Sequence, residues 1–146
     1  MYAFPHSSAA ARHHLVSARL RAELLALDAF DDQAIELSIE SCRKLGGGAP
    51  AAVQLELRIR NDDAQAGRAV LLVDLLAGGR FPLSPPVITI VEADLPTSDL
   101  TAALDAALAQ WTPERSSVAV VVADAGRAAT RARPAIARGA FALAAV

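Results

Sequence analysis

Cysteine, aromatic residues and long apolar runs are all scarce in this chain of 146 residues, which has one cysteine and only 4% aromatic residues. The single thiol, Cys42, cannot form an internal disulfide, which agrees with a reducing compartment. No apolar run approaches the roughly 20 residues needed to cross a bilayer. The first residues, MYAFPHSSAAARHH, lack the basic-then-apolar pattern of a secretory signal. We therefore expect a cytoplasmic or nuclear protein with no membrane partner.

Neither sign of charge is in large excess, because the formal net charge is −2. A dedicated nucleic-acid binder is expected to be clearly basic, so this balance predicts no nucleic-acid partner. Residues 114–146 carry five arginines against two acidic residues, which makes this end of the chain mildly basic. It is either a contact for an acidic partner or a solvated tail.

Motifs for metals and phosphates are also missing. His6, His13 and His14 lack the spacing, and the cysteine or carboxylate partners, of a metal site. The glycine-rich stretch LGGGAP, residues 45–50, lacks the terminal Gly-Lys-Ser/Thr of a phosphate-binding loop. We expect neither a metal nor a cofactor.

The first predicted element is a helix from Ala9 to Phe30, a stretch without glycine or proline. Four apolar residues recur at helical spacing and form one stripe: Val16, Leu20, Leu24 and Leu27. Four charged residues are left for the outer face of this helix: Arg12, Arg19, Arg21 and Glu23.

Four segments with the character of strands follow. Residues 34–40 and 53–60 alternate apolar and polar side chains, which is typical of strands with one face in water. Residues 68–77 are apolar on both faces and predict a central strand, and residues 87–92 predict the fourth. Turn-forming residues separate them, so we expect a short antiparallel meander.

After the sheet, the apolar period changes to that of a helix. Thr97 or Ser98 is the expected N-cap, and one face of this helix carries Leu100, Leu104, Leu108 and Trp111. The valines of residues 115–130 favour a strand by propensity and a helix by spacing, and we interpret the segment as a helix. The order predicts an α+β fold with an N-terminal helix, a four-stranded antiparallel meander and two helices packed on one face.

The connection GGRFPLSPPVITI, residues 78–90, contains Phe81-Pro82 and Pro85-Pro86. Each proline fixes its own φ and biases the preceding residue toward an extended conformation, so the connection loses few conformations on folding. Phe81 is the expected anchor of this turn, and one X-Pro bond is a candidate for the cis form. A proline-rich ligand segment is the rival interpretation, which a position between two strands disfavours.

Three segments carry a family resemblance: AELLALDAF (residues 22–30), VLLVDLLAGGRFPLSPPVITI (residues 70–90) and TSDLTAALDAALAQW (residues 97–111). They resemble the opening helix, the strand with its aromatic-proline turn, and the long helix of the RWD domain family, the non-catalytic relatives of ubiquitin-conjugating enzymes. Only the second segment is distinctive. The resemblance implies an RWD-like domain at residues 12–133, an N-terminal extension at residues 1–11 and a C-terminal tail at residues 134–146.

A working ubiquitin-conjugating enzyme needs a cysteine thiolate beyond the fourth strand and a nearby asparagine. The stretch ALDAALAQWTP, residues 103–113, resembles the segment that follows the active-site cysteine in those enzymes. Ala103 stands where the nucleophile would be, and no His-Pro-Asn triplet lies upstream. Cys42 lies far along the chain at the end of the first predicted strand. We therefore predict that the protein is not an enzyme.

The resemblance implies a protein-interaction module, such as an adaptor or a subunit of a larger complex. Family members serve in translational stress signalling, ubiquitin or SUMO pathways and kinetochore complexes. The expected partner is another protein, and homo- or hetero-oligomers are both compatible with this role. The expected binding surface is either the first helix with its arginines or the wet sheet face, which carries Glu36, Glu40, Glu56, Arg58 and Arg60.

The alternative function is that of an inactive ubiquitin-conjugating-enzyme variant. Such a protein binds ubiquitin or a ubiquitin-like protein and assists a catalytic partner. An extended flap at residues 91–103, in place of a helix start, favours this alternative.

Overall fold

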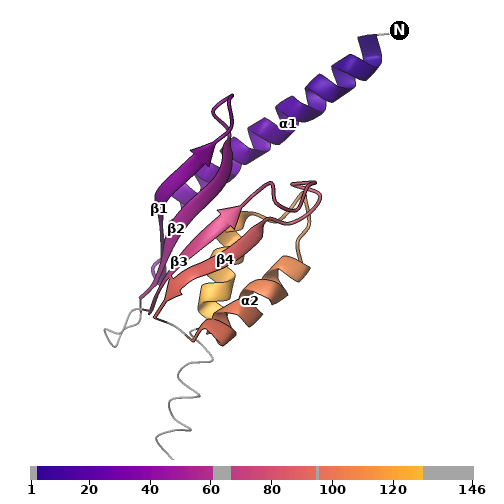
Figure 1. Cartoon of the computed structure of the whole chain (residues 1–146). Coiled ribbons are helices and arrows are strands. Elements are labelled where there is room, and N and C mark those ends of the chain that lie inside the picture. The colour runs from indigo at the N-terminus through magenta and orange to yellow at the C-terminus, as the bar shows by residue number, and fades with distance from the viewer. Residues whose placement is uncertain (1–2, 61–66, 95, 130–146) are drawn as a thin grey trace, which may run out of the picture.

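The computed structural model of this chain describes residues 3–60, 67–94 and 96–129, and the surroundings of side chains from residue 16 onward. Its labelled elements are α1 (Ala3–Asp28), β1 (Ile35–Lys44), β2 (Pro50–Ile59), β3 (Gly67–Asp74), β4 (Val87–Ala93) and α2 (Thr97–Ala109). A further helix follows at residues 118–129. Figure 1 shows this order along the chain. The predicted α+β fold of one helix, four antiparallel strands and two helices is confirmed.

Helix α1 packs on the sheet through the predicted stripe. Leu20 and Leu27 are fully buried, whereas Val16 and Leu24 are half-buried and packed against the core. The helix begins at Ala3 rather than at residue 9, so the expected N-terminal extension is helical from that residue on. The first turns of α1 project past the end of the sheet (Figure 1). The expected C-terminal tail lies outside the described residues.

The four strands pair in the order β1-β2-β3-β4, and each pair is antiparallel. The alternation predicted for β2 is confirmed, because its inward side chains are almost entirely buried: Val53, Leu55, Leu57 and Ile59. Leu55 lies opposite Leu71 of β3, and Val53 lies opposite Val73. These cross-strand pairs give the sheet one continuous apolar face, which we call the inner face.

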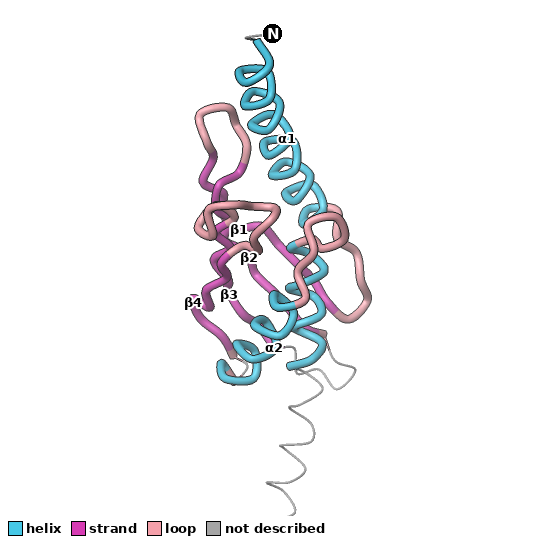
Figure 2. The backbone as a smooth tube through the Cα atoms, turned by 90° about the vertical axis from the view of Figure 1, so that its right-hand side faces the viewer, coloured by secondary structure: helices cyan, strands magenta, loops and turns pink. Residues whose placement is uncertain are grey.

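Residues 118–129 form a helix, as predicted for the ambiguous valine-rich segment. Val118 and Val122 are fully buried in the core. The helix lies so close to the sheet that a Cβ atom added at Gly126 would come within 3.3 Å of the Leu57 methyl groups. Figure 2 shows the three helices on the same side of the sheet. Burial on the inner face therefore outweighs the strand propensity of the valines.

The start of α2 differs from the prediction. The N-cap residue is Pro96, with φ −55° and ψ 116°, and no side chain caps the helix. Thr97 and Ser98 lie within the first turn instead, so their predicted capping role is wrong. Proline fixes φ near the value that leads into a helix, and Asp99 places a negative charge in the first turn, where the helix dipole favours it.

An ion pair ties the 118–129 helix to the turn before β1. Arg127 contacts the carboxylate of Asp32, and the Ala34 amide donates a hydrogen bond of 2.8 Å to the same carboxylate. The hydrogen bond from Ala34, followed by the one from Arg127, holds the pKa of Asp32 below its usual value. The turn is thus fixed both by its own backbone and by a helix from the far end of the described chain.

Candidate interaction surface

The sheet face opposite the helices is the candidate site, and we call it the open face. Within the described residues, no helix covers this face. Four of the five residues predicted for the wet sheet face lie on its first two strands, Glu36 and Glu40 on β1 and Glu56 and Arg58 on β2, and Arg60 directly follows β2. Arg68 of β3 and Glu92 of β4 extend the charged region across the sheet.

The centre of the charged region is Glu56, which sequence reasoning placed in water but which is only 9% exposed. The Arg68 Nε atom donates to its Oε2 atom at 2.7 Å, and Arg58 contacts the other carboxylate oxygen. Hydrogen bonds from Arg68, and then from Arg58, hold the pKa of Glu56 below its usual value. Two arginine heads thus cover a carboxylate that is held in its charged form.

Arg68 connects its own strand, β3, to the other three strands. Its Nη1 atom donates to Glu92 of β4 at 2.6 Å, and Nη2 lies 3.9 Å from Glu40 of β1. Its carboxylate neighbours, Glu92 first and Glu56 second, raise the pKa of the guanidinium further above neutrality. Nothing in the alternation of β3 marked this arginine as the hub, because its partners come from three other strands.

Around this centre, side chains of β2 and of the residue that follows it pair with carboxylates of β1. Arg60 donates to Glu36 at 2.6 Å, and the Gln54 amide donates to Glu40 at 3.1 Å. Exposed pairs of this kind are worth little for stability, and their charged heads stay available to a partner.

Exposed apolar side chains border the charges on the same face. Leu72 of β3 is 39% exposed and Val87 of β4 is 46% exposed. Leu72 lies beside Gln54 of β2 on one side and Thr89 of β4 on the other. The open face therefore combines paired charges with an exposed apolar border, and arginine, which recurs in it, is enriched in protein-protein interfaces.

The first helix is the weaker candidate for a binding surface, because Arg19 is committed within the molecule. Its guanidinium bonds to Glu23 at 2.9 Å and to the carbonyl oxygen of Ser116 at 2.7 Å, and it also donates to the Pro113 carbonyl. Arg21 is exposed and donates to the Gly47 carbonyl. The side chain of Arg12 lies outside the described part of the chain.

The helical stripe predicted that Glu23 lies on the outer face of α1. This prediction is wrong, because Glu23 is buried and only 3% exposed. Its Oε1 atom accepts from Arg19, and its Oε2 atom accepts a hydrogen bond of 2.9 Å from the backbone N–H of Val118. The carboxylate thereby satisfies the start of the 118–129 helix. Because its partner lies 95 positions away, no local pattern could have placed it in the core.

The aromatic-proline turn packs against Arg19, which also bonds to Glu23. Phe81 is 4% exposed, its ring lies 5.8 Å from that of Trp111, and the Arg19 guanidinium is 5.7 Å from its centre. The Trp111 Nε1 atom donates to the carbonyl oxygen of Pro82 at 2.8 Å, and the Phe81-Pro82 bond is cis. We call the contacts of Arg19, Glu23, Phe81 and Trp111 the α1 junction.

Glycine is favoured at both positions before the turn, but for a different physical reason at each. A Cβ atom on Gly78 would lie 2.9 Å from the carbonyl oxygen of Pro85, so a side chain does not fit there. Gly79 has a φ of 86°, which favours glycine over other residues. The predicted proline motif therefore depends on a glycine pair that sequence reasoning did not single out.

Cys42 and Ala103 lie in different parts of the fold. Cys42 is on β1, half-buried against the core. Ala103 is on α2, which packs against β4 at the other edge of the sheet. The only thiol is thus separated from the segment that resembles an active site by the width of the sheet.

The described residues contain no group of side chains that could hold a metal ion. Within residues 3–60, 67–94 and 96–129, no three His, Cys, Asp or Glu side chains are grouped so that they can hold a metal ion. The side chains of His6, His13 and His14 lie outside that description. In the same part of the chain, no helix has both the length and the apolar character of a membrane span.

Comparisons with protein-family models, with curated proteins and with solved structures find no match to this chain. The structure shows the α+β fold, whereas the resemblance to RWD domains stays a prediction.

Proposed function

We propose that this protein is a non-enzymatic interaction module, an RWD-like adaptor or a subunit of a larger complex, that binds another protein through its open face. The observation that carries the proposal is the hub of Arg68 and Glu56, surrounded by exposed charges and bordered by Leu72 and Val87. A broad sheet face with arginine and exposed apolar side chains suits a protein surface better than a small substrate.

The internal pairing of the open face supports selective binding. Arg58 and Arg60 are held by Glu56 and Glu36, so a partner with complementary charges meets side chains that are already in position. Such charges contribute mainly to specificity and to the rate of association. The exposed apolar border then contributes through the hydrophobic effect.

The start of α2 favours this function over that of an inactive ubiquitin-conjugating-enzyme variant. Strand β4 ends at Ala93 and α2 begins at Thr97, so most of residues 91–103 belong to the end of a strand and the first turns of a helix. An extended flap was the feature that favoured the alternative.

Charge reversal on the open face tests the proposal. Arg58→Glu combined with Arg60→Glu should abolish capture of the partner from the native organism, measured by quantitative mass spectrometry. The matched control, Arg80→Glu with Arg115→Glu, changes the net charge equally at two exposed positions off the sheet and should retain the partner. Equal loss in both variants, or retention in both, contradicts binding through the open face.

A thioester assay tests the non-enzymatic part. With ubiquitin, ATP and an activating enzyme, the protein should form no adduct that a thiol reductant removes. A reducible adduct that disappears in Cys42→Ala would contradict the proposal directly.

A further inference from the structure

The two edge strands of the sheet differ in how they are protected. The edge strand β1 carries four charged residues and two register shifts, features that discourage pairing with another chain. The other edge strand, β4, has the sequence VITIVEA, in which Glu92 is the only charged residue. Its residues Val87–Ile90 are in regular register with β3, and its one register shift falls later, next to Glu92.

The outer side of β4 is free for backbone pairing. Strand β4 is last in the strand order, and no described strand pairs with it on the side away from β3. An edge of this kind presents backbone N–H and C=O groups to which an extended chain can add as a further strand. Val87 and Val91 leave about half of their surfaces exposed beside it.

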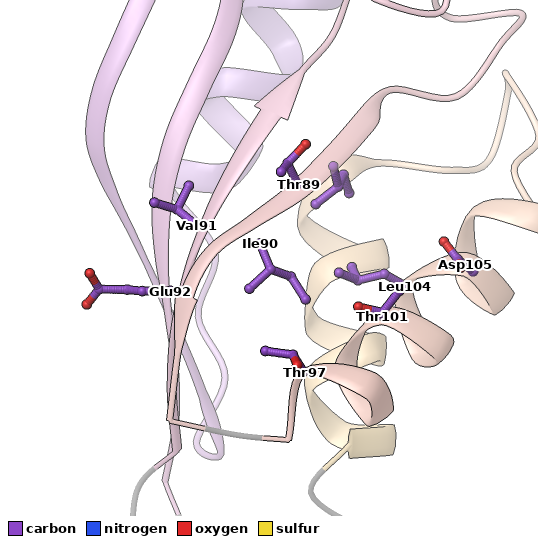
Figure 3. Close-up of a pocket in the computed structure, with 9 residues that line it drawn as sticks. Thr89, Ile90, Val91, Glu92, Thr97, Thr101, Leu104 and Asp105 are labelled. Carbon is purple, nitrogen blue, oxygen red and sulfur yellow. The ribbon is translucent and has the colours of Figure 1, made fainter.

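A groove runs along this edge between β4 and α2. Its volume is about 410 Å³, and its lining includes Ile88, Ile90, Thr97, Thr101 and Leu104. Figure 3 shows Ile90, Thr97 and Thr101 pointing into the space between the strand and the helix, whereas Glu92 points away from it. An added strand would place every second side chain in this space.

The segment of chain that forms the groove carries charge of one sign. Residues 81–113 contain four acidic residues and no lysine or arginine: Glu92, Asp94, Asp99 and Asp105. Glu92 is paired with Arg68. Among the described residues, Asp94, Asp99 and Asp105 form no ion pair. Asp105 lines the groove itself, so an occupant with positive charge is favoured.

We propose that the β4–α2 groove binds an extended peptide of a partner protein, which adds to β4 as a fifth strand and alternates apolar residues with lysine or arginine. The apolar side chains enter the groove, and the basic ones point to the opposite face of the sheet, where Glu92 lies. The negative charge of Asp105 at the groove adds a longer-range attraction. This site goes beyond the open face, from which it differs in its partner chemistry. A second copy of the chain is disfavoured, because it would bring two acidic edges together.

The test uses a fluorescein-labelled synthetic peptide of about eight residues, in which valine alternates with arginine, to match the seven residues of β4. Fluorescence anisotropy with the full chain should show saturable binding that weakens as salt is added. Backbone amide shifts in NMR should concentrate on residues 87–93 and 97–109. A peptide with glutamate in place of arginine should not bind.

A control peptide and three variants separate strand addition from general attraction between charges. The arginine peptide with every backbone amide N-methylated has no N–H to donate to β4 and should bind at least about tenfold more weakly. Asp105→Lys should weaken binding about tenfold, whereas Glu114→Lys, an equal charge change at an exposed residue outside the groove, should leave it unchanged. Thr101→Trp, which fills the groove, should also abolish binding.

Three outcomes would overturn the proposal. The first is equal binding of the methylated and unmethylated peptides, which excludes strand pairing. The second is equal weakening by Asp105→Lys and Glu114→Lys, which reduces the effect to net charge. The third is a dimer in sedimentation that Thr101→Trp dissociates, which makes a second copy the occupant. Loss of open-face binding in Arg58→Glu with Arg60→Glu leaves all three readouts unaffected, so the two sites are judged separately.

Discussion

The molecule holds charged side chains in two very different settings, the α1 junction and the open face. At the junction, Glu23 is buried and its carboxylate bonds both to a guanidinium and to a backbone amide 95 positions away. On the open face, Arg60 and Glu36 form a pair of similar geometry in which the side chains are 66% and 42% exposed. The contacts look alike, yet only the first joins separate parts of the fold.

The difference shows that burial, rather than the number of ion pairs, decides what a charge does for stability. Removing one partner from a buried pair leaves the other desolvated and unpaired, which is strongly destabilising. An exposed partner is simply hydrated again. We therefore expect the junction to control the free energy of unfolding and the open face to control binding.

The largest expected effect follows from removing the aromatic ring of the junction. Phe81→Ala should lower the free energy of unfolding by about 3–5 kcal/mol, because it empties a buried site against Trp111 and Arg19. Urea denaturation measures the change. Leu83→Ala, two residues away at a side chain that is 70% exposed, should change it by less than about 0.5 kcal/mol. A Phe81→Ala protein as stable as the parent would show that the ring is not an anchor.

The buried carboxylate comes next. Glu23→Ala should cost about 3 kcal/mol, because the Val118 amide and part of the Arg19 guanidinium lose their acceptor. The matched control is Asp28→Ala at an exposed acid of the same helix, which should stay within about 0.5 kcal/mol of the parent. If the two variants have the same free energy of unfolding, the buried carboxylate of the junction contributes no more to stability than an exposed one.

The contribution of Glu56, the carboxylate at the centre of the open face, to the free energy of unfolding should depend on pH. The folded-state pKa of Glu56 is held below its unfolded value by Arg68 and then Arg58. Its stabilising contribution is therefore complete above the unfolded pKa of about 4.3 and is lost as the pH falls through the folded pKa. Glu56→Gln should flatten part of the acid limb of a stability-pH curve. Asp32, whose pKa is also lowered, should supply the part that remains.

The smallest effect belongs to the rim of the open face. Arg60→Ala should change the free energy of unfolding by no more than about 0.5 kcal/mol, although it breaks a pair at 2.6 Å. A double-mutant cycle with Glu36→Ala measures the coupling. A coupling as large as the loss in Glu23→Ala would erase the distinction between the two settings.

Patterns with a short period predicted the sheet and the helices correctly. Alternation placed the buried residues of β2, and helical spacing gave the buried face of α1 and the helical state of residues 118–129. Such patterns are local, because each element presents one face to one core. The cap of α2 was the local error, since Pro96 starts the helix without any side-chain acceptor.

The site features that escaped prediction depend on distant neighbours. Glu23 looked like a surface residue until the start of the 118–129 helix was placed beside it. Gly78 looked like an ordinary loop residue, yet the Pro85 carbonyl occupies the space that a side chain at this position would need. Arg68 became a hub only because three other strands bring their carboxylates to it.

The bond from the Val118 amide to Glu23 also reports on how complete the fold is. Each hairpin of the sheet closes between neighbours in the chain, whereas this bond closes a loop of 95 positions, and the entropy cost of closure grows with that length. It therefore exists only when α1, the sheet and the 118–129 helix are in place together. Exchange of this one amide with solvent deuterium should consequently follow opening of the whole molecule rather than local fraying.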